Sequence, residues 1–299
     1  MKRLLLSILV LLMYACGSGE KSAEQAMLES LESEEESSPQ VDEQSLQAIL
    51  EQIPSPLEVA VLLKELGTNY DPTILNSPDK IASYNSNYEK AMNLGVYGTD
   101  LGYTNIYEQN QDALGYLTAI RDLADGLSIG QFFNFGVIKR LATNSRNLDS
   151  LLLITTKNFN DINTYLQDQQ RTNLSVLLLT GGWIEALHIL CQVSEKYPES
   201  QALKERIGEQ KIIMDQIMLL LSEYGKINPN IKDLEDQMQQ LQAIFNDIEI
   251  TQTYAESKMV EVDGIMMIQN ESTTEINITD EHLKDINQIT AEIRNSVIK

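Results

Sequence analysis

Two sets of side chains in this sequence could support chemistry, a cysteine with a nearby base and a pair of histidines. Cys191 follows His188 by three residues in an apolar segment, so both would lie on one face of a helix. A thiolate nucleophile needs such a base, but a cysteine among apolar residues is typically a small buried side chain, which is our interpretation. The second histidine, His282, is distant and has no partner at metal-ligand spacing. We therefore predict a non-catalytic protein without a metal site or cofactor.

Tyrosines are concentrated between residues 84 and 116, which hold six of the twelve in the chain. In a helix, Asp100 would lie three residues from both Tyr97 and Tyr103, and Tyr107 would follow Tyr103 by one turn. Two interpretations are open. The rings pack in the core with Tyr103 among them and Asp100 bonded to a tyrosine hydroxyl, or these four side chains line a groove for a ligand or partner.

The N-terminus has the pattern of a targeting segment. Lys2 and Arg3 precede an apolar run over residues 4–12, and Ala15 stands directly before Cys16. The run is shorter than the roughly 20 apolar residues that span a bilayer. It resembles a bacterial lipoprotein signal peptide, which implies a thioether-linked diacylglycerol on Cys16 and cleavage before it. The membrane is thus expected as a partner through this lipid.

Composition divides the chain of 299 residues into three parts. Residues 1–15 are the expected signal peptide, residues 16–44 an acidic disordered tether with nine acids and one base after the cysteine, and residues 45–299 a helical domain. The net charge of −22 disfavours nucleic acid and anionic lipid headgroups. By analogy with lipoprotein sorting in diderm bacteria, Gly17 favours the outer membrane.

Apolar residues in the third part follow helical periodicity. Alternating spacings of four and three residues, typical of antiparallel helices packed along one seam, recur in residues 113–127, 148–166, 203–224 and 234–266. We predict an all-α fold, a multi-helix bundle of long antiparallel heptad-patterned helices. Residues 174–190 are apolar on all sides, which predicts the central helix, kinked at its paired glycines. A last helix over residues 280–297, capped by Thr279, completes the bundle.

Two segments of the sequence are compatible with more than one structure. Residues 182–198 resemble the second half of a tetratricopeptide repeat, although no second copy follows at its period of about 34 residues. Residues 269–279 are rich in polar and β-branched side chains, so they form either a loop or, with residues 259–268, a β-hairpin. We favour the loop, because the helical spacing continues to Met266.

Three glycines interrupt the tyrosine-rich region. Gly95, Gly98 and Gly102 would each weaken a helix by about 1 kcal/mol relative to alanine, which indicates close helix packing or a local break. This stretch and the residues after it, through residue 129, resemble uncharacterised helical lipoproteins of diderm bacteria, a resemblance that implies no particular chemistry.

These observations predict a lipid-anchored cell-envelope protein whose helical domain is a non-catalytic interaction scaffold for another envelope protein. The alternative is a lipoprotein that binds a small ligand, a sugar or a peptide, through the tyrosine- and glycine-rich residues 84–116.

Overall fold

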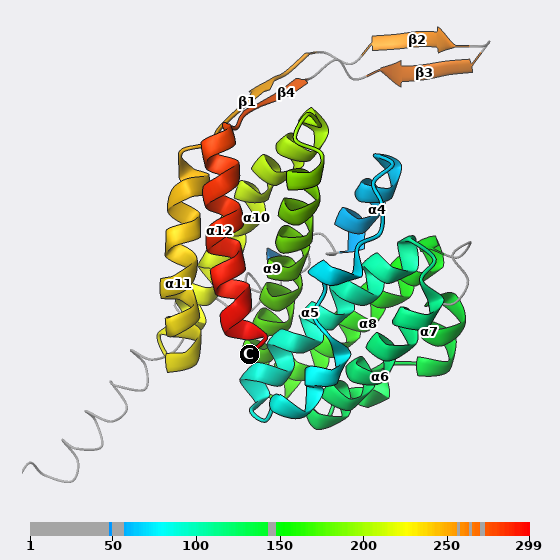
Figure 1. Cartoon of the computed structure of the whole chain (residues 1–299), viewed down its shortest axis with the longest axis vertical. Coiled ribbons are helices and arrows are strands. Elements are labelled where there is room, and N and C mark those ends of the chain that lie inside the picture. Colours follow the sequence, from blue (N-terminus) through cyan, green and yellow to red (C-terminus); the bar gives the residue numbers. More distant parts are fainter. Residues whose placement is uncertain (1–47, 50–56, 143–147, 256–257, 263–264, 270–272) are drawn as a thin grey trace, which may run out of the picture. The chain divides into compact units, whose positions relative to one another are not determined.

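A computed structural model describes residues 48–49, 57–142, 148–255, 258–262, 265–269 and 273–299. These residues are mostly helical, which confirms the prediction of an all-α multi-helix bundle (Figure 1). The expected signal peptide and tether lie outside them. The α-helices are α4 (Leu57–Glu65), α5 (Asn87–Ile106), α6 (Asn110–Gly126), α7 (Phe135–Ala142), α8 (Leu148–Asp168), α9 (Thr172–Lys196), α10 (Gln201–Gly225), α11 (Pro229–Asn246) and α12 (Asp280–Val297), with 3-10 helices η1 (Pro72–Ile74), η2 (Pro78–Ser83) and η3 (Gly130–Phe132).

Reciprocal side-chain caps fix where two of the helices begin. At the start of α5 the Ser86 hydroxyl accepts a hydrogen bond from the Glu89 amide at 3.1 Å, and the Glu89 carboxylate accepts one from the Ser86 amide at 2.8 Å. Thr279 and His282 make the same exchange at the start of α12, so Thr279 caps this helix as predicted. Such caps satisfy amides that have no partner inside the helix.

Helix α9 is the central helix, as predicted, and α5, α8, α10 and α12 all pack on it. It is long and apolar enough to cross a membrane, but almost all of that stretch is buried among the other helices. The helix runs on through Gly181 and Gly182, which serve close packing on α5. A Cβ on Gly181 would lie 2.1 Å from the Met92 carbonyl oxygen, and one on Gly95 would lie 2.0 Å from the Leu178 carbonyl oxygen.

Residues 249–277 contain a β-structure, and our prediction of a helix to Met266 followed by a loop is wrong. The strands are β1 (Glu249–Thr253), β2 (Lys258–Val262), β3 (Ile265–Gln269) and β4 (Thr273–Asn277). They form two antiparallel ribbons, in which β1 pairs with β4 and β2 pairs with β3. This is the β-hairpin alternative, but it begins earlier than we expected, at Glu249. The physical reason is composition, because threonine, valine and isoleucine recur in these strands and favour the pleated backbone.

The two ribbons, which we call the β-arm (β1–β4), lead away from the helices (Figure 1). The first ribbon is fixed at its base, where Ile276 is buried against Gly208 of α10 and the Lys211 ammonium donates to the Ile248 carbonyl oxygen at 2.7 Å. Further out, Tyr254 is 83% exposed and Met259 is 70% exposed. The β-arm thus presents large apolar side chains to solvent.

The tetratricopeptide resemblance gains no support from the helix lengths. A tetratricopeptide repeat fits two helices and their turn into about 34 residues, and residues 182–198 would be the second of these helices. In the structure they belong to α9, a single helix of 25 residues that begins at Thr172. The turn that should precede residue 182 is therefore absent from this helix.

Candidate functional site

The tyrosines singled out in the sequence lie inside the protein and hold a neighbouring segment. Tyr97 and Tyr103 are fully buried, as the core interpretation expects, and Tyr107 is half-buried. Their hydroxyls face residues 68–77, which cross α5 before η2. The hydrogen bonds join Tyr97 Oη to the Ser77 carbonyl oxygen (2.9 Å), the Asp71 amide to Tyr103 Oη (3.2 Å) and Tyr107 Oη to the Thr68 hydroxyl (2.5 Å).

The rings also contact one another. The ring centroids of Tyr103 and Tyr107 lie 4.9 Å apart, and Tyr70 from the crossing segment lies 5.4 Å from Tyr103. Burial raises the pKa of the Tyr97 and Tyr103 hydroxyls, so both keep their protons at neutral pH. The cluster therefore binds the protein's own backbone, and its polar atoms are engaged there.

Asp100 belongs to a buried charged cluster that joins α5, α9 and α12. The Arg294 guanidinium makes two hydrogen bonds of 2.6 Å to the carboxylate of Glu185, and both side chains are buried. Arg294 also donates to the Ile74 carbonyl oxygen at 3.1 Å. Asp100 is fully buried beside this pair and accepts a hydrogen bond from the Asn76 amide at 3.2 Å. The expected bond from a tyrosine hydroxyl to Asp100 is not formed, because the hydroxyl of Tyr97 donates to a backbone carbonyl instead.

Asp100 is held in its neutral form. Burial raises the pKa of this carboxyl well above its ordinary value of 3.8, the nearby Glu185 carboxylate raises it further, and Arg294 acts in the opposite direction. The Oδ1 atom of Asp100 is buried and has no hydrogen-bond partner within the described residues.

The raised pKa of Asp100 makes stability depend on pH. Since this pKa is higher in the folded chain than in the unfolded chain, folding takes up a proton above about pH 4, and the free energy of unfolding falls as the pH rises. In Asp100→Asn the side chain is a neutral amide at every pH, so its burial requires no proton. We expect this variant to equal the parent protein near pH 4 and to exceed it increasingly at higher pH. Urea unfolding at several pH values measures this, and a constant difference across pH contradicts it.

The cysteine and the histidines serve structure in the described part of the chain. Cys191 is buried, and burial raises the pKa of its thiol. Burial also lowers the pKa of His188 to about 4, and its Nε2 lies 3.2 Å from the Ile74 carbonyl oxygen. His282 caps α12. Over the described ranges, no three His, Cys, Asp or Glu residues come together as a metal site would require.

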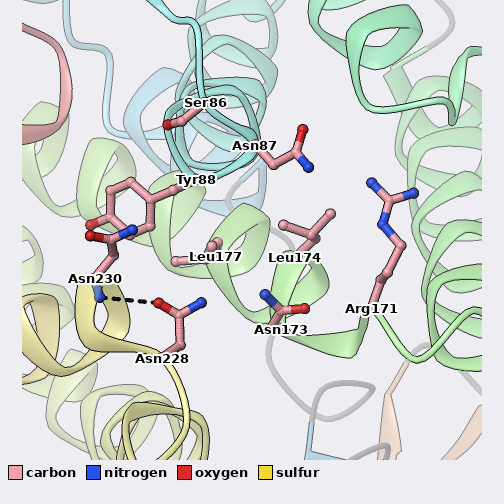
Figure 2. Close-up of a pocket in the computed structure, with 9 residues that line it drawn as sticks. All are labelled: Ser86, Asn87, Tyr88, Arg171, Asn173, Leu174, Leu177, Asn228 and Asn230. Atoms are coloured by element: carbon pink, nitrogen blue, oxygen red, sulfur yellow. Dashed lines mark hydrogen bonds between the residues drawn. The ribbon is translucent and has the colours of Figure 1, made fainter.

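An open cleft lies where α5, α9 and α11 begin (Figure 2). Its volume is about 350 Å³, and its floor contains the buried side chains of Leu174 and Leu177. The other lining residues are polar. They are Ser86, Asn87, Tyr88, Arg171, Asn173, Asn228 and Asn230.

Residues at the starts of the three helices position this lining. Asn228 accepts hydrogen bonds from the Asn230 and Ile231 amides at the start of α11, at 3.0 and 3.4 Å. At the start of α9, the Arg171 guanidinium donates to the Leu127 carbonyl oxygen at 3.1 Å, which directs this side chain along the edge of the cleft. Sequence reasoning missed the cleft, because its residues come from three distant segments and share no motif.

Comparisons with known proteins give no match, whether to protein-family models, to curated proteins or to solved structures.

Proposed function

We propose that this protein is a lipid-anchored scaffold of the cell envelope, with a non-catalytic helical domain that binds another envelope protein. The β-arm is the observation that carries the proposal. Its antiparallel ribbons expose Tyr254 and Met259, two large apolar side chains that are available for contact with a partner. A helical body holds the base of the β-arm through Ile276.

The N-terminal segment supplies the second part of the proposal. A diacylglycerol on Cys16 would attach the chain to a membrane, for which the outer membrane is our expectation, while the net charge of −22 over the whole chain adds no attraction to anionic lipid. The acidic residues 17–44 would extend by self-repulsion and keep the domain away from the bilayer. If the chain is anchored in this membrane, a partner that contacts the β-arm must belong to the same compartment of the cell.

Ligand binding through the tyrosine-rich region has weaker support. The side chains of Tyr97, Asp100 and Tyr103 are buried, and each of them bonds to the backbone of residues 69–77. A ligand would have to displace that segment to reach them. We therefore do not assign the ligand-binding alternative to these residues.

Site-specific photo-crosslinking in the producing cells tests the scaffold function. With a photoreactive amino acid in place of Met259, we expect a discrete adduct with one envelope protein, and we expect Cys16→Ser to abolish it because the chain no longer reaches the membrane. The matched control places the same amino acid at Ile212, an apolar residue of α10 that is 52% exposed. Equal adducts from both positions contradict a role of the β-arm, and an adduct that persists in Cys16→Ser contradicts the anchor.

A further inference from the structure

The cleft at the start of α5, α9 and α11 contains polar groups that the protein itself does not use. The side-chain carboxamides of Asn87, Asn173 and Asn230, the Nδ2 atom of Asn228 and the hydroxyl of Tyr88 have no hydrogen-bond partner among the residues that the structure describes. Asn87 and Asn230 are exposed, and the other three residues are half-buried. Five unengaged groups around one cavity are a set of contacts available to a ligand.

The charge of the lining restricts what this ligand can be. No carboxylate lines the cleft, although the whole chain carries a net charge of −22. The Tyr88 hydroxyl stays neutral, because burial raises its pKa to about 12. Without a carboxylate the cleft has no negative charge to pair with an amine or to neutralise a metal ion. Arg171 is its one charged residue, and part of that guanidinium already donates to Leu127.

The hydrogen-bonding groups that line the cleft are most complementary to a ligand that carries hydroxyl groups. A carboxamide both donates and accepts, as does a tyrosine hydroxyl, and each hydroxyl of a polyol also does both. An apolar ligand would leave these amides without partners at a cost in binding free energy, and an anion would use only the donors. Leu174 and Leu177 add apolar groups to the floor, against which the C–H groups of a sugar ring can pack.

We propose that this cleft, lined by Asn87, Asn173, Asn228 and Asn230 with Tyr88 above a leucine floor, binds a small neutral polyhydroxylated ligand of the mono- or disaccharide class. A volume of about 350 Å³ is at the lower end of ligand sites, which suits a molecule of this size. The site is preformed, because Ser86 and Asn228 cap their helices and the two leucines are buried. The site is independent of the β-arm and of the scaffold function.

Calorimetric titration of the full chain tests the proposal. The panel contains neutral hexoses, pentoses, N-acetylhexosamines, inositol and disaccharides, with inorganic phosphate as the separate anionic arm. We expect at least one neutral sugar to bind, with an affinity that does not change when the ionic strength is raised. If no sugar of the panel binds, or if phosphate alone binds and added salt abolishes it, the proposal is wrong.

Paired variants locate the binding in the cleft. The double change Asn87→Ala with Asn230→Ala removes two unengaged carboxamides, so it should weaken sugar binding roughly tenfold to a hundredfold and leave the melting temperature nearly unchanged. Asn246→Ala, an exposed change at the other end of α11, is the matched control and should bind as the parent protein does. Sugar binding that survives the double change with undiminished affinity overturns this assignment.

Discussion

Gly181→Ala should lower the free energy of unfolding by about 3 kcal/mol or more, although alanine is the better helix former. Gly181 lies in the middle of α9, and its added Cβ would stand 2.1 Å from the carbonyl oxygen of Met92 on α5. That neighbour is backbone, so only a separation of α5 from α9 can relieve the overlap. These two helices share the most extensive helix–helix contact in the described part of the bundle. Chemical denaturation of the variant measures the loss directly.

Gly98→Ala is the matched control, because Gly98 lies in α5 but faces no close neighbour. No heavy atom outside its own stretch of helix lies within 4 Å of the position where its Cβ would stand. The substitution should therefore stabilise the protein by about 0.5–1 kcal/mol, through the smaller loss of backbone entropy on folding. A stabilising effect of Gly181→Ala as well would show that α5 and α9 are not in the close contact described.

The glycines illustrate how much of the packing the sequence reveals. Their number in a helical pattern predicts that some are needed for close packing, but it does not distinguish Gly95, which needs to be glycine, from Gly98, which does not. That difference depends on which side of α5 faces α9. Some helix ends are easier to predict, because a cap such as Thr279 acts within a few residues of its own position.

Our favoured prediction missed the β-arm because periodicity and composition indicate different structures in this stretch. Apolar residues spaced four and three apart run on through Phe245, Ile248, Met259 and Met266, and this spacing indicates a helix. The same stretch is rich in β-branched residues, which favour strands. In the structure α11 ends at Asn246 and the β-branched residues determine the backbone conformation. Where apolar residues are this dense, spacing alone does not separate helix from strand.

The buried charged cluster was missed for a different reason. Glu185 is a charged residue within the apolar helix α9, and a buried charge requires a partner, so a partner could have been expected. The identity of this partner could not be predicted, because Arg294 lies 109 residues away on α12 and Asp100 comes from α5. The cleft of Figure 2 presents the same difficulty, since its asparagines gain their common role only when three helices meet.

Arg294→Met should cost about 3–5 kcal/mol of unfolding free energy at neutral pH. The side chains of Glu185 and Arg294 are 0% and 8% exposed, so solvent screens this ion pair very little. Without the guanidinium, the Glu185 carboxylate would remain buried next to Asp100 with no positive charge to balance it. The Ile74 carbonyl oxygen would also lose a donor. Urea denaturation near pH 7 measures the loss.

Two further variants separate the buried charge from the loss of the arginine itself. The double change Glu185→Gln with Arg294→Met leaves no unpaired charge, so it should recover most of the lost stability, as paired replacements of buried ions commonly do. Arg206→Met removes an ion pair of similar length, 2.8 Å to Glu209, whose side chains are 43% and 41% exposed. It should cost less than about 1 kcal/mol because water screens the charges. Equal losses from Arg294→Met and Arg206→Met would mean that the cluster of α5, α9 and α12 is open to solvent.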